Sequence, residues 1–324
     1  MSGAASDSPS VPATPSRPAP GVAHPSPLSV RWVHGSASSR HRTDPPLQVY
    51  RHDDRTFVLR ESKDVSFEAP FLYLFLGDER ALLLDTGATS DPGRFPLRTT
   101  VDRLLNEATT SSVPGGLELL VAHSHGHGDH VAGDAQFAGR PRTQVVGRDA
   151  ASVQQFFGFA RWPEEVREVD LGGRTLQMFG IPGHHAASLA VYDPETHWLL
   201  TGDTVYPGRL YVREMTAFRS SLDRLVDFTA TRPVSHVLGC HIEMTRTPRR
   251  DYPLGCRYQP NEPPLEMSVG QLLRVRDAAR AVSDRPGAYW YEDFAIFHGP
   301  CRAAVMAELL RGLGANLRHR LLGS

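Results

Sequence analysis

The chain has few cysteines, little net charge and no long hydrophobic run. Its three cysteines, Cys240, Cys256 and Cys301, form no CxxC pair. An odd number of scattered thiols favours the reducing cytoplasm over a disulfide-stabilised secreted protein. No apolar segment reaches the roughly 20 residues that a bilayer span requires, so we expect no membrane partner. The net charge of −1 gives no reason to expect nucleic acid as a partner.

The first part of the chain lacks both a basic leader and an apolar core, so it does not resemble a secretory signal. Residues 1–46, ending at Pro45-Pro46, are rich in proline, serine and alanine and contain little apolar surface to bury. We therefore expect a disordered extension over 1–46. A single catalytic domain is expected over 47–324, with a helical and loop extension from about residue 247.

From residue 47 onward, short strands alternate with helices in two similar halves. The predicted strands cover residues 48–51, 56–60, 71–76, 81–84, 117–122, 143–146, 169–171, 175–179, 188–192, 198–201, 236–238 and 293–297. The predicted helices cover residues 97–108, 150–157, 217–230, 268–282 and 302–321. This order predicts two sheets packed face to face with helices outside.

What the chain does have is histidine, gathered directly after the predicted strand 117–122 in the run HGHGDH. Neutral imidazole and carboxylate bind zinc and similar divalent ions. Alternation puts His125 and His127 on one side of an extended chain, and a glycine lets the backbone turn before Asp129 and His130. One segment can therefore face two adjacent metal positions. The alternative interpretation is a fortuitous histidine-rich loop or a metal-scavenging tract.

Three later segments each place a candidate ligand after a predicted strand. These are His184 in IPGHH, Asp203 in LLTGDT and His241 in VLGCH. Alone, each would more often be an ordinary polar residue at a strand end. Together with HGHGDH, the combination resembles the metallo-β-lactamase-fold hydrolase superfamily, whose motifs run in the same order, over about residues 47–245.

The resemblance implies an α+β fold, a four-layer αββα sandwich with the site at one edge. It also implies two divalent metal ions, Zn²⁺ in the first place, with iron or manganese as alternatives. The implied ligands are His125, His127 and His184 for the first metal, Asp129, His130 and His241 for the second, and Asp203 as a bridge between them.

Two further expectations concern how these ligands work. Asp85 matches the superfamily's earliest aspartate, which supports ligands from behind, and a ligating imidazole needs such a partner on its other nitrogen. Two metals about 3.5–4 Å apart can share a water and lower its pKa towards neutrality. Asp129 is then the expected catalytic residue, because it can orient the attacking hydroxide while it binds metal.

The same residues narrow the activity within the superfamily. The true β-lactamases carry cysteine or serine where this chain has Asp203, and redox-active di-iron relatives carry glutamate where it has His127. We therefore predict a glyoxalase II-like or lactonase-like hydrolase that cleaves an ester, thioester or lactone bond of a small molecule. Two alternatives stay open: a mononuclear-iron sulfur (persulfide) dioxygenase and a non-catalytic metal-binding protein.

Substrate identity should depend on loops outside the ligands, at Tyr206–Arg209 and Arg249–Pro264. Several side chains there could donate to a substrate oxygen, although packing explains them equally well: Tyr206, Arg209, Tyr211 and Tyr252. The basic residues Arg246, Arg249 and Arg250 could attract a carboxylate, but a solvated surface is the simpler interpretation.

Four other residues near the motifs are placed outside the ligand set. His123 and His236 are expected at strand ends or behind the ligands, and His185 is not expected to bind metal. Alternation points Cys240 away from its neighbour His241 and into the core.

Overall fold

The computed structural model describes residues 28–38, 40–108, 116–282 and 284–322, and the strands within them form two six-stranded sheets and one three-stranded sheet. The first sheet has the order β1 (Leu47–Arg51), β2 (Thr56–Glu61), β3 (Phe71–Leu76), β4 (Arg80–Leu84), β5 (Glu118–Ala122) and β6 (Thr143–Val145). Strands β1 to β4 pair antiparallel, whereas β4, β5 and β6 run parallel.

The second sheet has the order β13 (Glu266–Met267), β12 (His236–Gly239), β10 (Trp198–Gly202), β9 (Leu189–Asp193), β8 (Thr175–Gly180) and β7 (Arg167–Asp170). The small third sheet has the order β11 (Arg209–Val212), β15 (Ala295–His298) and β14 (Gly287–Trp290). The helices are α1 (Leu97–Ala108), α2 (Gly128–Val131), the 3₁₀ helix η1 (Ala132–Phe137), α3 (Ala150–Phe157), α4 (Met215–Ala230), α5 (Val269–Ala281) and α6 (Arg302–Leu322).

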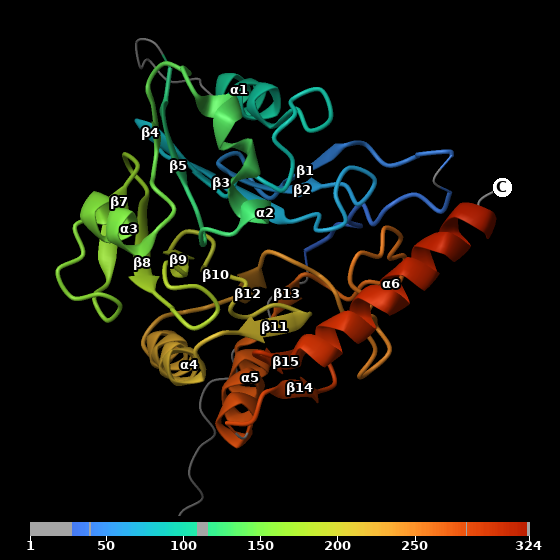
Figure 1. The fold of residues 1–324 in the computed structure, drawn as a ribbon. Helices are drawn as coiled ribbons and strands as arrows, with labels where there is room; N and C mark the ends of the chain where they lie inside the picture. The colour runs from blue at the N-terminus through green and yellow to red at the C-terminus, as the bar shows by residue number, and fades with distance from the viewer. Residues whose placement is uncertain (1–27, 39, 109–115, 283, 323–324) are drawn as a thin grey trace, which may run out of the picture.

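The two large sheets lie face to face, with α1 outside the first sheet and α4 and α5 outside the second (Figure 1). Strand β3 shows how the sequence builds these layers, because every residue in it is buried. Its alternate side chains Phe71, Tyr73 and Phe75 enter the core between the sheets, whereas those of Leu72, Leu74 and Leu76 pack towards α1. Burial on both faces explains the continuous hydrophobic run.

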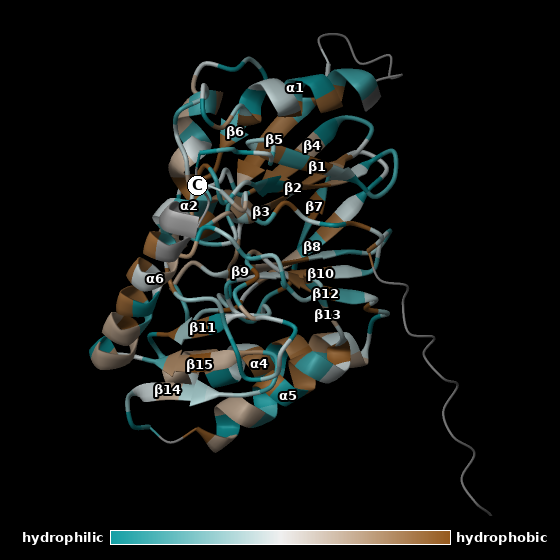
Figure 2. Cartoon of the chain, turned by 90° about the vertical axis from the view of Figure 1, so that its right-hand side faces the viewer, coloured by the Kyte–Doolittle hydropathy of each residue, from teal (hydrophilic) through white to brown (hydrophobic). Residues whose placement is uncertain are grey.

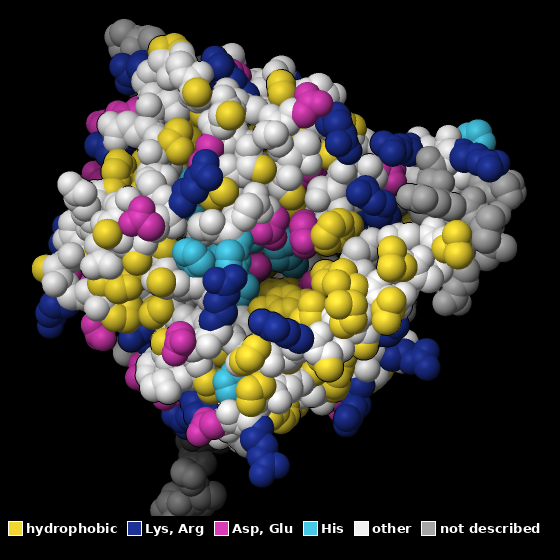
Figure 3. Space-filling view, viewed as in Figure 1, with side chains coloured by type: hydrophobic (Ala, Val, Ile, Leu, Met, Phe, Trp, Pro, Cys, Tyr) yellow, Lys and Arg dark blue, Asp and Glu magenta, His cyan; other side chains and the backbone are white. Residues whose placement is uncertain are grey.

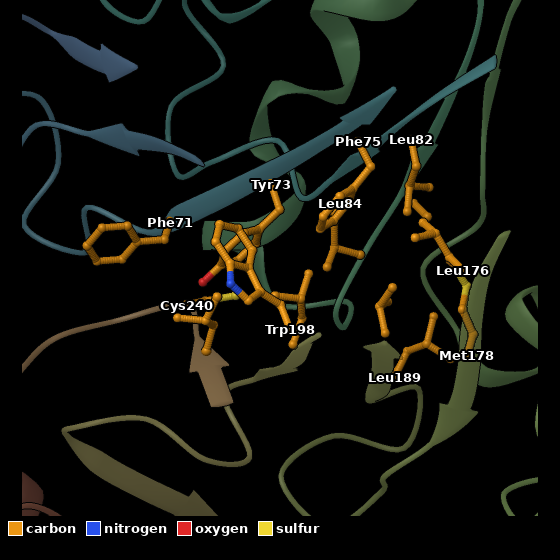
Figure 4. Packing of buried hydrophobic residues seen from close by; sticks show 14 of the residues in the cluster. Phe71, Tyr73, Phe75, Leu82, Leu84, Leu176, Met178, Leu189, Trp198 and Cys240 are labelled. Atoms are coloured by element: carbon orange, nitrogen blue, oxygen red, sulfur yellow. The ribbon is translucent and has the colours of Figure 1, made fainter. Parts of the chain in front are cut away.

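The core between the sheets joins strands from both halves of the chain. Tyr73 and Leu84 from the first sheet meet Met178, Leu189 and Trp198 from the second (Figure 4). Two further apolar clusters lie between the sheets and their outer helices, and brown segments occur in both the strands and the helices of Figure 2. The predicted α+β, αββα sandwich is confirmed.

The structure differs from the predicted disordered extension over residues 28–46. Leu28 and Trp32 are buried in the core between the sheets, and the Trp32 ring lies edge-on to Phe71 with centroids 4.9 Å apart. The Leu28 backbone N–H also donates to Glu266 Oε1 at 3.1 Å. A single buried tryptophan brings enough apolar surface to order a segment whose average composition is polar. The remainder of the predicted extension, residues 1–27, lies outside the described residues.

The third sheet was not expected as a unit, because only its strand β15 was anticipated, over residues 293–297. Its strand β11 occupies part of the segment expected to be a substrate loop. Within the described residues no helix combines the length and hydropathy that a membrane span requires. All three cysteines are free thiols, as expected.

Candidate metal centre

The candidate ligands meet because their strands end at one edge of the sandwich. Strands β10 and β12 run parallel, and β8 runs in the same direction, since both β8 and β10 pair antiparallel with β9. His184, Asp203 and His241 therefore follow three strand ends on the same edge. In the first sheet the parallel strands β4 and β5 likewise end near each other, followed by Asp85 and by the loop that starts α2.

The first cluster consists of three imidazoles whose ring nitrogens converge. His125 Nε2 lies 2.9 Å from His127 Nδ1, and His184 Nε2 lies 3.2 Å from the former and 3.0 Å from the latter. His125 and His184 are buried, whereas His127 reaches the surface of a cavity. This geometry points three nitrogens at one position.

The second cluster is formed by Asp129, His130, Asp203 and His241. Asp129 Oδ2 lies 3.3 Å from His130 Nε2 and 3.3 Å from His241 Nε2. Asp203 Oδ1 lies 3.5 Å from His241 Nε2, and Asp203 Oδ2 lies 3.5 Å from His130 Nε2. Two carboxylates and two imidazoles thus face one another.

Asp203 stands between the two clusters. The Oδ2 atom that approaches the second cluster also lies 3.8 Å from His125 Nε2 and 3.7 Å from His184 Nε2. The structure therefore brings all seven predicted ligands together, three in the first cluster and four, Asp203 among them, in the second.

Partners on the far side of the rings fix which nitrogen faces the centre. His184 Nδ1 donates to the Tyr211 carbonyl at 2.7 Å, and His241 Nδ1 donates to the Glu68 carbonyl at 3.1 Å. A carbonyl can only accept, so these Nδ1 atoms carry the proton and, in the neutral ring, Nε2 presents a lone pair. His130 Nδ1 is held in the same way by Asp85 Oδ2 at 2.9 Å.

Burial keeps the first cluster neutral. It lowers the pKa of His125 well below its usual value and, together with the neighbouring His184, lowers that of His127 to about 4. Burial also lowers the pKa of His184. The three rings therefore carry no charge near neutral pH.

In the second cluster the imidazoles are protonated near neutral pH. Burial alone would lower the pKa of His130, but the carboxylates of Asp129 and Asp203 raise it well above its usual value. The same balance, with Asp203 as the main neighbour, raises the pKa of His241 to about 9. Burial would raise the pKa of Asp203, yet the charges of His241 and His130 hold it below its usual value.

The side chains fit divalent cations. Buried polar atoms need partners, yet Asp203 Oδ1 has no hydrogen-bond partner among the described residues. Three neutral imidazoles and a mixed imidazole–carboxylate set are donor groups that zinc and its neighbours accept. The convergent ring nitrogens and the buried carboxylate of Asp203 both favour cations at the two positions.

Asp85 lies behind the second cluster, where its predicted supporting role requires it. Besides holding His130, it accepts hydrogen bonds from the backbone and hydroxyl of Ser124 at 2.7 and 2.8 Å. Cys240 Sγ lies 3.3 Å from Asp85 Oδ2, so the thiol is buried behind the ligands. Ser124, which also contacts His125 Nδ1 at 3.2 Å, was missed because serine at a strand end carries no metal-specific signal.

The other nearby histidines lie outside both clusters. His123 is buried with Nε2 3.4 Å from Asp134 Oδ1, and His236 Nδ1 lies 3.0 Å from Ser235 Oγ. His185 Nδ1 accepts the backbone N–H of Ala187 at 3.1 Å. These positions agree with their exclusion from the ligand set.

A cavity of about 610 Å³ opens beside the centre and is lined by Asp129, His127 and Asp203. Sequence interpretation missed Glu68 there, whose pKa is raised to about 7 by burial. No local signal could identify it, since it reaches His241 across 173 positions. It also missed Arg213 and Arg302, which line the same cavity.

Of the two interpretations open for Arg209, the structure favours packing over a substrate contact. This side chain is buried and forms ion pairs with Glu243 at 2.5 Å and Asp251 at 2.6 Å. Tyr206 lines the cavity, but its hydroxyl donates to the Arg209 carbonyl at 2.5 Å. Both residues therefore hold the third sheet in place. The guanidinium group of Arg209 faces Glu243 and Asp251 and is not directed to a substrate.

The remaining predicted contacts lie in three different places. Tyr211 lines the cavity beside the candidate ligands. Tyr252 accepts the Asn261 backbone N–H at 2.6 Å and, with Arg249 and Arg250, lines a separate surface depression. Arg246 borders a third depression near the N-terminal segment. The basic trio is thus directed away from the candidate metal centre.

Comparison with known proteins places this geometry in a family context. The family model described as the Metallo-beta-lactamase superfamily matches residues 67–228, half of the chain. A hydroxyacylglutathione hydrolase of Ectopseudomonas mendocina (strain ymp) is 28% identical over 174 residues, which are 50% of this chain and 60% of that protein. One of Synechococcus sp. (strain JA-3-3Ab) is 33% identical over 121 residues, 34% of this chain and 45% of that protein. The chain thus spans about half the length of these curated relatives.

Solved structures show only distant likeness. A metallo-β-lactamase from Pontibacter korlensis superposes with a TM-score of 0.47 at 15% identity, covering 73% of this chain and 100% of that one. The structure titled TMB-1 superposes with a TM-score of 0.49 at 14% identity, covering 73% of this chain and 98% of that one.

Proposed function

Because the chain belongs to the metallo-β-lactamase superfamily, we propose that it is a metal-dependent hydrolase of an ester, thioester or lactone bond in a small molecule. The observation that carries the proposal is Asp203, whose Oδ2 lies within 3.5–3.8 Å of ring nitrogens from both clusters. A carboxylate so placed can serve two cations at once. A thioester is the first substrate class to test, since the relatives named above are called hydroxyacylglutathione hydrolases.

The proposed cofactors are two divalent cations, zinc in the first place. His125, His127 and His184 would hold one; Asp129, His130 and His241 would hold the other; and Asp203 would touch both. Bound there, two cations would lower the pKa of a shared water and polarise the bond to be cleaved.

Asp129 is the proposed catalytic residue among the ligands. It lines the cavity and its side chain is 23% exposed, whereas that of Asp203 is 8% exposed. One carboxylate oxygen lies near His130 and His241, so the group can accept a hydrogen bond from a water and direct its lone pair towards a substrate in the cavity. Asp85 holds the neighbouring ring in place and does not reach the substrate.

The proposed catalytic unit extends to the end of the described chain. Residues of β15 and α6 line the cavity, so the C-terminal part contributes to the site as well as the sandwich. We also propose the cytoplasm as the place of action, on the ground of the three free thiols.

The test combines metal analysis with a substrate panel. Purified protein should contain two zinc ions per chain, and it should hydrolyse a glutathione thioester or a lactone faster than a β-lactam. Chelation should abolish turnover, and added zinc should restore it. One iron per chain with oxygen uptake on glutathione persulfide would contradict the proposal, as would an inert, metal-replete protein across the panel.

A further inference from the structure

The cavity beside the candidate metal centre has two walls of different polarity. Histidine and acidic side chains lie along one side of the hollow, and hydrophobic side chains lie along the other (Figure 3). The apolar wall consists of Val212, Leu254, Phe297, Val305, Met306 and Leu309. A water-filled cavity for a small polar substrate does not need such a wall, since exposed apolar surface is unfavourable.

Helix α6 supplies half of this wall and leaves it exposed. Five of the eight exposed large hydrophobic side chains in the described part of the chain belong to α6. Met306 is 57% exposed and Leu309 41% exposed, and both line the cavity. Concentrated exposure of this kind marks a binding surface more often than chance.

Contacts along α6 fix the helix to the body of the protein, so its exposed hydrophobic side chains have a defined direction. Arg311 pairs with Asp251 at 3.1 Å, and Asn316 Nδ2 donates to the Gly255 carbonyl at 2.7 Å. Between them, the helix approaches the Leu254 carbonyl so closely that a Cβ at Gly312 would lie 1.8 Å from its oxygen. Met306 and Leu309 thus belong to a wall held in place.

Two guanidinium groups border the same cavity. Arg213 and Arg302 line it, and neither side chain has a hydrogen bond or ion pair with another described residue. Arginine binds carboxylate and phosphate groups. A ligand that uses both features must carry an apolar chain and an anionic group.

We propose that the cavity binds an amphipathic acyl substrate, with its acyl chain on the α6 wall and an anionic group on its other part near Arg213 and Arg302. This inference rests on the proposed hydrolase function, because the ester or thioester lies between the two parts and faces the metal centre. It specifies the substrate class as acyl esters or thioesters with a chain of several carbons and a carboxylate- or phosphate-bearing alcohol or thiol.

The first measurement is a binding series that requires no bond cleavage. S-alkyl thioethers of 3-mercaptopropanoate, from ethyl to octyl, are titrated calorimetrically into the zinc-loaded protein. We expect the affinity to rise by up to about fourfold for each added methylene, which corresponds to about 0.8 kcal/mol of apolar burial. A flat series would overturn the acyl-chain site.

Variants on α6 locate the site. The double substitution Met306→Ser and Leu309→Ser should remove most of the gain per methylene. Leu313→Ser is the matched control, because Leu313 is 68% exposed on the same helix but does not line the cavity. Equal losses in both proteins would contradict the assignment to the cavity wall.

Substitutions at two glycines of α6 test whether binding depends on the position of the helix as well as on its hydrophobic side chains. Gly312→Ala places a Cβ against the Leu254 carbonyl and should shift the helix, whereas Gly314 has nothing within 4 Å of its added Cβ. We expect Gly312→Ala to weaken octyl thioether binding at least tenfold relative to the ethyl compound, and Gly314→Ala to leave the ratio unchanged. A wild-type ratio in Gly312→Ala with α6 displaced in its crystal structure would contradict the proposal.

The anionic part is tested with the neutral amide of the octyl thioether. Wild-type protein should prefer the carboxylate, and Arg302→Gln should reduce that preference several-fold. No preference in the wild type would refute the anion contact.

Hydrolysis of the corresponding acyl thioesters then tests the proposed hydrolase function separately from the acyl-chain site. Chain-dependent thioether binding without any thioester turnover would refute the proposed function and retain the acyl site. Turnover that is indifferent to chain length would retain the function and refute the acyl site.

Discussion

The two clusters of candidate ligands lie beside the same carboxylate, that of Asp203, but differ in charge. The three-histidine cluster of His125, His127 and His184 is neutral, because burial lowers the pKa of each ring. The histidines of the Asp129–His130–Asp203–His241 cluster are also buried, yet the carboxylates beside them raise the pKa values of both imidazoles.

The difference shows that neighbouring carboxylates, more than burial, decide whether the imidazoles of a cluster are neutral or protonated before a cation binds. The three-histidine cluster presents lone pairs near neutral pH. The second cluster holds protons between its imidazoles and carboxylates, and a cation there must replace them. Two adjacent sites of one centre are therefore expected to differ in how their affinity depends on pH.

The largest effect is expected from a substitution of Asp203, the residue proposed to serve both clusters. Asp203→Ala should reduce the metal content from two ions towards one per chain, because the remaining ligands lose their common carboxylate. We expect kcat/KM to fall by about 10³-fold, equivalent to about 4 kcal/mol of transition-state stabilisation. Metal analysis and steady-state kinetics provide the check, and two ions with an unchanged rate would refute the shared position.

A smaller effect confined to one cluster is expected from Asp85→Asn. The carboxylate holds His130 Nδ1 at 2.9 Å and does not touch the three-histidine cluster. Loss of such support costs about 10–100-fold in metal affinity, so the second zinc should bind more weakly and the first should not. Competition with a chromophoric chelator measures both constants.

The matched control is Asp134→Asn, whose carboxylate faces the buried His123 outside both clusters. Equal weakening of both zinc ions in Asp85→Asn, or the same loss in Asp134→Asn, would contradict a cluster-specific role.

The pH dependence of metal binding should separate the clusters directly. His241 has a pKa of about 9, so below that pH it is protonated and must lose its proton before it can bind metal. Affinity at the second cluster should therefore fall as the pH decreases from 8 to 6, by about tenfold per unit for each proton released. His127, with a pKa of about 4, is already neutral throughout this range.

Calorimetry in buffers of different ionisation enthalpy counts these protons. Binding to the three-histidine cluster should release none at pH 7, and binding to the second should release at least one. Equal proton release for the two ions would show that the clusters do not differ as described.

The smallest effect is expected from His185→Ala, which tests the boundary of the three-histidine cluster. The ring centroid of His185 lies 4.9 Å from that of His127, but its Nδ1 accepts from Ala187. We expect zinc affinity to change by no more than about twofold, the range of about 0.5 kcal/mol typical of substitutions outside a site. Loss of one zinc ion would make His185 a ligand.

The sequence allowed the candidate ligands to be chosen because metal chemistry needs unusual residue types at strand ends. His125, His184 and His241 could be identified because their motifs together, in this order, resemble those of the superfamily. The two large sheets were equally predictable, since fully buried strands such as β3 are continuous hydrophobic runs.

The parts that sequence interpretation missed depend on distant partners. The sequence left Arg209 open between packing and a substrate contact, because its ion-pair partners Glu243 and Asp251 lie 34 and 42 positions away. Trp32 lies in a polar stretch, and its burial depends on contacts with Tyr50 and Phe71. The cavity wall on α6 could not be predicted, because the sequence does not show where the last helix packs.

Anomalous diffraction at the zinc absorption edge from crystals of the metal-loaded protein tests the central claim most directly. Two peaks should appear about 3.5–4 Å apart, one among His125, His127 and His184 and the other among Asp129, His130 and His241, with Asp203 contacting both. A single peak, or two peaks of which only one contacts Asp203, would contradict the account.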